Sequence, residues 1–189
     1  MNITKRIFDL ALALLASFIL AIPIILVALA VRLTSTGAVF YWSDRVGYKN
    51  KIFRMPKFRS MRVDTPAVAT HLLTDPDAYL TPIGSILRKS SLDELPQLWS
   101  IWIGDMSFVG PRPALFNQDD LIKLRTECGV HELVPGLTGW AQINGRDELP
   151  IPEKVELDRQ YICKRSFGFD IFILCKTVSK VIRRDGVTH

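Results

Sequence analysis

The apolar stretch LALALLASFILAIPIILVALAV, residues 10–31, decides the fold of this chain because it contains no charged side chain. As an α-helix it would be roughly 33 Å long, enough to cross the hydrocarbon core of a bilayer. Pro23 lies inside the run, and a proline removes one helical hydrogen bond and clashes with the preceding turn. We therefore expect a membrane-inserted helix with a kink at Pro23.

Three interpretations of this segment are consistent with its residues. A secretory signal peptide cleaved near Ala30 would have an apolar run longer than the usual length of about 7–15 residues. A straight spanning helix normally shows an asymmetry of basic residues, whereas here Lys5 and Arg6 precede the run and Arg32 follows it. Basic residues at both ends suit a re-entrant helix that enters one leaflet and returns. The residues alone leave the spanning and re-entrant forms equally open.

The rest of the chain has the composition of a folded domain. Of 189 residues, 24 are basic and 19 acidic, which gives a net charge of +5, and 48% are hydrophobic. These values exclude a disordered, acidic or collagen-like chain. The three cysteines are scattered and odd in number, which indicates a reducing compartment and neither a disulfide framework nor a zinc site. We expect a membrane segment over residues 1–33 and a cytoplasmic domain over residues 34–189.

Hydrophobic patterning predicts an α+β fold that is mostly helical. Residues 39–61 are typical of a β-hairpin whose turn spans Ser43 to Asn50, and Pro56 either interrupts the second strand or marks an edge strand. Thr81 is the expected N-cap of a helix that ends at Lys89. Further helices are expected over residues 117–128, 153–164 and 170–184. The last of these is amphipathic and basic, which suits either a membrane interface or packing on the domain core.

A run of seven basic side chains without an acid among them extends from Arg45 to Arg62, after the apolar segment. Near an anionic membrane each would contribute about 1 kcal/mol of attraction. We therefore expect membrane lipids, and no nucleic acid, as partners of this surface. The residues are Arg45, Lys49, Lys51, Arg54, Lys57, Arg59 and Arg62.

The stretch RKSSLDELPQLW, residues 88–99, carries the strongest chemical signal. Ser91 and Glu94 have the spacing of a capping box, so a helix start is the simplest interpretation. Capping does not explain Asp93 beside Glu94. Of two adjacent carboxylates, one can attack phosphorus or take a proton while the other holds a divalent cation.

Two further stretches offer groups for an anionic ligand. In GDMSFVGPRP, residues 104–113, two prolines fix the backbone around Arg112, and a fixed guanidinium suits phosphate recognition. In PGLTGWAQINGR, residues 135–146, glycines allow close backbone approach, and polar groups could hold a nucleotide or sugar. Neither stretch is a dinucleotide-binding fingerprint or a P-loop.

These stretches, together with KIFRMPKFRSMR at residues 51–62, resemble the bacterial sugar transferases known as monotopic phosphoglycosyl transferases. The resemblance runs from about residue 3 to residue 184 and matches the minimal catalytic core of that family. It implies transfer of a sugar 1-phosphate from a UDP-sugar to undecaprenyl phosphate, with release of UMP. It also implies a re-entrant helix and a location at the bacterial inner membrane, with the catalytic domain facing the cytoplasm. Small members often have serine before the membrane proline, whereas Ile22 stands here, so the bend rests on Pro23 alone.

The resemblance also implies roles for individual residues. Asp93 would attack the β-phosphorus and form a covalent phosphosugar intermediate, while Glu94 would help to bind Mg²⁺. The candidates for binding the substrate and its phosphates are Lys57, Arg88, Arg112, Gln142, Asn144, Arg146 and Asp158. Two other functions stay open: a membrane-anchored glycosyltransferase that releases UDP, and a non-enzymatic membrane adaptor. The sugar is also open, as is the oligomeric state, for which a homodimer is one option.

Overall fold

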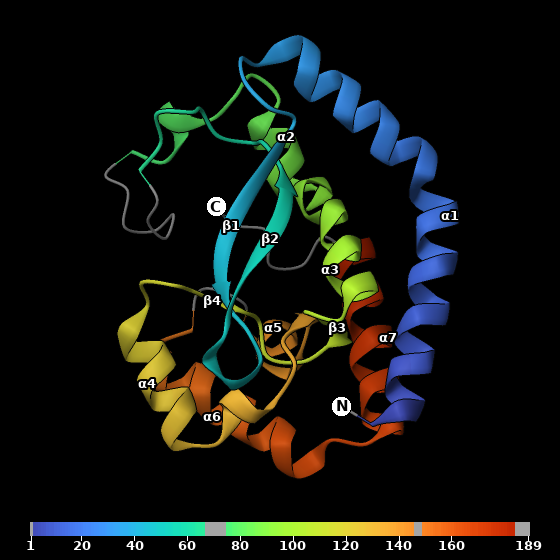
Figure 1. The fold of residues 1–189 in the computed structure, drawn as a ribbon, viewed down its shortest axis with the longest axis vertical. Helices are drawn as coiled ribbons and strands as arrows, with labels where there is room; N and C mark the ends of the chain where they lie inside the picture. Colours follow the sequence, from blue (N-terminus) through green and yellow to red (C-terminus); the bar gives the residue numbers. More distant parts are fainter. Residues whose placement is uncertain (1, 67–74, 146–148, 184–189) are drawn as a thin grey trace.

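The computed structural model describes residues 2–66, 75–145 and 149–183, and within them the protein is α+β and mostly helical, as predicted. Helix α1 (Ile3–Thr34) runs along one side of the molecule, and the other elements lie beside it (Figure 1). The Asn2 side chain caps its start by accepting from the Thr4 amide at 3.1 Å. With a mean hydropathy of 2.9, α1 is long and apolar enough to cross a membrane by length and composition.

Helix α1 is continuous, and it bends about midway along its length (Figure 1). Pro23 lies inside it and cannot donate to the carbonyl of Ile19 one turn earlier, so it accounts for the bend. The helix does not double back on itself as a hairpin of two separate helices.

Both halves of α1 pack on the same domain. In the first half, Ala13 is fully buried in a core that includes Ile101 and Phe108. In the second half, Val27 and Val31 pack with Phe58 and Leu87. The opposite side of the helix exposes large apolar side chains: Ile7, Leu14, Leu15, Phe18, Ile19, Ile22, Ile25, Leu26, Leu29 and Leu33. This one-sided exposure leaves an apolar surface along the length of α1.

Polar side chains fix the start of α1 to the domain. Asp9 is fully buried, and its carboxylate accepts from the Ser107 hydroxyl at 2.8 Å and the Phe108 amide at 3.3 Å. Lys5 pairs with Asp170 at 2.5 Å. Arg6 donates to the carbonyls of Ile101 and Trp102 at the end of α3 (Leu98–Ile103).

The predicted β-hairpin is confirmed. Strands β1 (Phe40–Val46) and β2 (Ile52–Phe58) pair antiparallel, with Phe40 opposite Phe58, and β4 (Ala114–Leu115) adds to the other side of β1. Of the two predicted alternatives for Pro56, the structure shows the second, because Pro56 lies within the continuous strand β2, which is an edge strand. The predicted turn was too long, because Ser43–Val46 continue the strand and the reversal is confined to Gly47–Lys51. The short helix η1 (Tyr48–Asn50) forms this reversal.

A second pair of strands joins two of the sequence motifs. Strand β3 (Ser107–Val109) runs parallel to β5 (Gly136–Thr138), and these strands come from residues 104–113 and 135–146 respectively. The backbones approach closely, since a Cβ atom added to Gly136 would lie 2.1 Å from the amide nitrogen of Gly110. Only glycine fits at that position.

The four helices predicted beyond α1 are present, although each begins at a different residue. The observed bounds are α2 (Gly84–Lys89), α4 (Asp119–Glu127), α5 (Trp140–Asn144), α6 (Ile151–Lys164) and α7 (Phe167–Arg183), with short helices η3 (Asp77–Tyr79) and η5 (Val130–Glu132). Of these, α5, η3 and η5 were not predicted. The prediction of Thr81 as an N-cap is wrong, because its hydroxyl donates to the Ser60 carbonyl and α2 begins three residues later. Helix α7 begins before Asp170 because the Ser166 hydroxyl accepts from the Phe169 amide.

Candidate active site

The acidic pair lies on a short 3₁₀ helix, η4 (Leu92–Gln97), between α2 and α3. The chain enters η4 through Ser91, whose φ of 56° is in the left-handed region. The capping-box prediction is wrong, because the Ser91 side chain makes no cap hydrogen bond and only its carbonyl accepts from the Glu94 amide. The tight geometry of η4 leaves Asp93 buried and Glu94 partly buried.

Two cations from distant parts of the chain hold the Glu94 carboxylate. Lys57 on β2 donates to Glu94 Oε1 at 2.7 Å. Arg112, in the loop after β3, donates to the same oxygen at 2.5 Å and to Oε2 at 3.3 Å. This fork-like contact fixes the Arg112 guanidinium as well as the carboxylate. The structure therefore brings together three of the predicted site residues.

The neighbouring Asp93 carboxylate is held less tightly. Its Oδ2 atom lies 3.9 Å from Lys57 Nζ, which is an ion pair but longer than a hydrogen bond. Arg88 also acts on Asp93 electrostatically, and its guanidinium lies 3.3 Å from the sulfur of Met61. Asp93 is thus surrounded by positive charge without being locked to one partner in the way that Glu94 is.

The two carboxylates differ in their pKa values. Burial, supported by the negative charge of Glu94, raises the pKa of Asp93 above its usual value, against the opposing effect of Lys57. Burial also acts to raise the pKa of Glu94, but Arg112 and Lys57 outweigh it and hold that pKa well below its usual value. Neighbouring acids whose pKa values are pushed apart are typical of sites that divide two roles between them.

Asp158 lies away from this pair, on α6. It is 1% exposed, and its Oδ2 accepts from Arg125 of α4 at 2.9 Å and 2.6 Å. Burial raises the pKa of Asp158, and Arg125 opposes that effect. The Asp158 carboxylate is therefore enclosed by protein and bound to Arg125.

The polar and aromatic residues of the glycine-rich stretch, residues 135–146, differ in what they contact. The Asn144 amide donates to the carbonyl of Trp140 within its own helix, α5. Trp140 packs on Phe169 and donates to Gln160, so its ring belongs to an aromatic cluster. Both polar atoms of the Gln142 side chain are buried and have no hydrogen-bond partner among the described residues. Arg146 lies outside the described residues.

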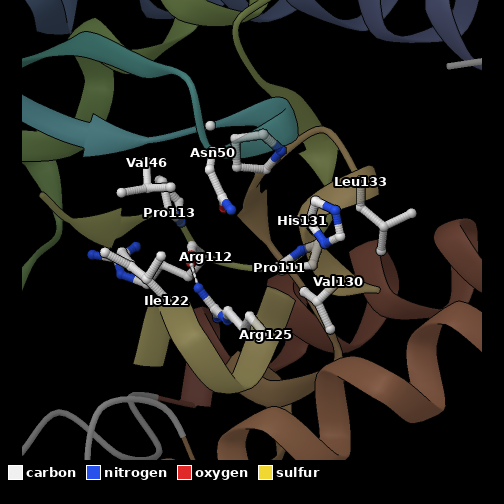
Figure 2. A pocket seen from close by; sticks show the side chains of 13 residues that line it. Val46, Asn50, Pro111, Arg112, Pro113, Ile122, Arg125, Val130, His131 and Leu133 are labelled. Atoms are coloured by element: carbon white, nitrogen blue, oxygen red, sulfur yellow. Dashed lines mark hydrogen bonds between the residues drawn. The ribbon is translucent and has the colours of Figure 1, made fainter. Parts of the chain in front are cut away.

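A small cavity adjoins the Arg112 loop. Its volume is about 30 Å³, and its lining includes Arg112, Arg125, Asn50 and His131 (Figure 2). That volume holds a water molecule or two and is far too small for a nucleotide. Figure 2 shows the Arg125 side chain extending from α4 toward the backbone of Arg112.

The carboxylates of the site decide which kind of Mg²⁺ binding it could support. Within residues 2–66, 75–145 and 149–183, no cluster of three or more His, Cys, Asp or Glu side chains could hold a metal ion. Mg²⁺, however, is commonly bound through one or two carboxylates together with substrate phosphates and water. The Asp93–Glu94 pair fits a Mg²⁺ ion shared with a bound diphosphate, and does not fit a resident ion held by protein alone.

Sequence reasoning missed two residues that the structure makes important. Asp9, which directly precedes the apolar run, has no assigned role in the sequence analysis, although an acid at the edge of a membrane segment is costly unless it has a partner. Arg125 has no assigned role in the sequence analysis, which predicts only the helix that contains it. Its spacing of four from the buried Leu121 places it on the inner face of α4, which was the available signal.

An apolar helix of membrane length, packed on a domain whose acidic pair is surrounded by cations, is the arrangement expected of a transferase that handles phosphates beside a membrane. The chain belongs to the bacterial sugar transferase family, whose model matches residues 1–184. This confirms the family indicated by the motifs, and with it the assignment of the protein as a transferase.

Individual relatives support the same family. The "Uncharacterized sugar transferase EpsL" of Bacillus subtilis (strain 168) is 42% identical over 98% of this chain and 90% of its own length. The "UDP-glucose:undecaprenyl-phosphate glucose-1-phosphate transferase" of Escherichia coli (strain K12) is 40% identical, and the "UDP-galactose-lipid carrier transferase" of Erwinia amylovora is 36% identical. These two matches cover 95% and 96% of this chain but only 40% and 41% of the relatives. The chain therefore spans about two fifths of the length of these larger relatives.

Proposed function

We propose that the protein transfers a sugar 1-phosphate from a UDP-sugar to undecaprenyl phosphate through a covalent intermediate on Asp93. The observation that carries the proposal is the unequal pair, in which Glu94 is bound by Lys57 and Arg112 while Asp93 is only loosely paired. The names of the E. coli and Erwinia amylovora relatives support the substrate class.

The reaction has two displacements at one phosphorus atom. An Asp93 carboxylate oxygen attacks the β-phosphorus, the bond to the bridging oxygen breaks, and UMP leaves. An oxygen of the lipid phosphate then attacks the same phosphorus, and the Asp93 carboxylate leaves. The product is an undecaprenyl diphosphate sugar, which would begin the assembly of a membrane glycan. The covalent step lets two anionic substrates use one site in turn.

The residues around Asp93 reduce the repulsion between a carboxylate and a diphosphate. Lys57 and Arg88 place positive charge beside Asp93, and Arg112 presents a guanidinium from a loop stiffened by two prolines. Glu94 would share Mg²⁺ with the diphosphate. When bound, that ion would neutralise charge on the leaving phosphate. Gln142 has unpartnered amide atoms, and it is the best candidate in the glycine-rich stretch for a direct contact with the donor.

The proposal includes a location in one leaflet of the bacterial inner membrane, with the domain on the cytoplasmic side. Its support is the docking of both halves of α1, through Asp9 at one end and Val31 at the other. A helix crossing perpendicular to the bilayer would carry one of these contacts to the far side. A bent helix lying in one leaflet keeps both contacts, and it lets its apolar side face the acyl chains.

The test is nucleotide release by detergent-purified protein with Mg²⁺, undecaprenyl phosphate and a panel of UDP-sugars. We expect UMP release that depends on the lipid and is abolished by Asp93→Asn. The matched control Asp119→Asn, at an exposed acid on α4, should retain activity. Release of UDP would indicate a glycosyltransferase instead. Lack of release with every sugar, together with no phosphosugar adduct on Asp93, would favour a membrane adaptor.

A further inference from the structure

A buried ion pair lies behind the loop that carries Arg112. Arg125 on α4 and Asp158 on α6 are 7% and 1% exposed, and two guanidinium nitrogens of Arg125 donate to Asp158 Oδ2. A pair this deeply buried is costly to desolvate and gives little net stability by itself. Its presence therefore calls for a role beyond tying two helices together.

The third contact of Arg125 suggests that role. Its Nη1 atom donates to the backbone carbonyl of Arg112 at 2.8 Å. Prolines flank Arg112 on both sides and have no amide hydrogen, so the loop is held largely through its carbonyl oxygens. The carbonyl of Pro111 accepts from the Gly136 amide, and that of Pro113 accepts from Arg45. Arg125 supplies the middle attachment, on the residue whose side chain binds Glu94.

We propose that Arg125 is a positioning residue for the transfer reaction, oriented by Asp158 and acting through the backbone of Arg112. Asp158 fixes the Arg125 guanidinium, Arg125 fixes the Arg112 carbonyl, and the fixed backbone directs the Arg112 side chain to Glu94. The assignment rests on the proposed function for its link to the diphosphate. The series of contacts that leads from Asp158 through Arg125 and Arg112 to Glu94 does not depend on the proposed function.

The test replaces the pair by apolar side chains of similar length, Arg125→Met with Asp158→Leu. Such replacements of buried ion pairs usually preserve stability, so folding is checked by the thermal midpoint. We expect kcat/KM for the UDP-sugar to fall about tenfold, the effect of losing one hydrogen bond from a charged group. The matched control, Arg159→Met with Glu156→Leu, removes an exposed ion pair on α6 and should leave kcat/KM unchanged.

A double-mutant cycle with Arg112→Lys separates positioning from a structural role. If Arg125 acts through Arg112, its tenfold effect should shrink to less than about twofold in the Arg112→Lys background. A tenfold loss that persists there would show that the ion pair serves α4 and α6 alone, and would overturn the proposal. An apolar pair with wild-type kcat/KM would overturn it as well.

A second readout needs no turnover. The rate at which phenylglyoxal modifies Arg112, followed by mass spectrometry, reports how firmly Glu94 holds the guanidinium. We expect this rate to rise several-fold in the apolar-pair variant, and an unchanged rate would contradict the positioning role. If the wild type released no UMP but the modification rate still rose, the proposed function would fail while the positioning of Arg112 by Arg125 would stand.

Discussion

The buried Asp9 carboxylate offers a sharp test of how α1 is attached to the domain. Asp9→Ala removes the acceptor for two donors, the Ser107 hydroxyl and the Phe108 amide, both buried. Each buried donor left without a partner costs about 1–3 kcal/mol. For the two donors together we expect a total near the lower end of that range, about 2–4 kcal/mol. For a chain of this size, this lowers the thermal midpoint by roughly 4–16 °C.

Ser107→Ala in the same chain supplies the internal control. Alone it removes the hydroxyl that donates to Asp9 and accepts a long contact from the Val109 amide, and it leaves Asp9 bonded to the Phe108 amide, which should cost about 1 kcal/mol. Combined with Asp9→Ala, it removes the unsatisfied hydroxyl as well, so the double variant should be less damaged than the sum of the singles. The measurement is thermal unfolding of the protein reconstituted in phospholipid vesicles, followed by tryptophan fluorescence, with the four proteins compared under one condition.

Strict additivity of the two substitutions would refute this reasoning. It would mean that Asp9 and Ser107 do not touch in the membrane-bound protein. A helix that crossed the bilayer and carried its N-terminus to the far side would give that result, because Asp9 could not then reach β3. The cycle therefore tests the one-leaflet placement of α1 as well as the energy of one hydrogen bond.

Three further outcomes are expected. Lys57→Met should lower kcat at least about tenfold, because Lys57 forms ion pairs with both Asp93 and Glu94. The control is Lys51→Met, at an exposed position just before β2. Equal activity of the two variants would contradict a role of Lys57 in the reaction. Glu94→Gln keeps the shape but removes the charge that Lys57 and Arg112 bind, so UMP release should fall by about 10²-fold, and near-wild-type release would count against a shared Mg²⁺. Pro23→Ala should lower the thermal midpoint although alanine favours a helix, because a straightened α1 cannot keep both halves packed; a higher midpoint would show that Pro23 does not set the bend.

The sequence was most informative where a pattern is local. The hairpin and the existence of α4, α6 and α7 follow from alternation, helical spacing and turn residues within short windows. Boundaries were less predictable because they depend on single hydrogen bonds. The Thr81 hydroxyl bonds to Ser60 rather than to a helix amide, and nothing near Thr81 in the sequence announces that partner.

The same difference between local patterns and distant contacts applies to the candidate site. Asp93 beside Glu94 could be found from their adjacency, and Arg112 from its flanking prolines. The sequence could not show that Lys57 and Arg112 both donate hydrogen bonds to Glu94 rather than to Asp93. These contacts join residues that are separated by 37 and 18 positions. The support of the Arg112 carbonyl by Arg125 is equally non-local, and a buried arginine on a polar helix looks like any solvated one until its neighbours are known.

Contacts between α1 and the elements around Asp93 and Glu94 connect the position of the acidic pair to the position of α1. On β2, successive side chains point to opposite faces, so Phe58 packs with Val31 of α1 while Lys57 turns to Glu94. At the other end, Arg6 holds the last carbonyls of α3, which directly follows the η4 helix that carries the acidic pair. The carboxylates are thus attached to the apolar helix on two sides through short, rigid elements. In the proposed one-leaflet placement, the depth of α1 therefore fixes the depth of Asp93, which the proposed reaction between a soluble nucleotide and a lipid phosphate requires.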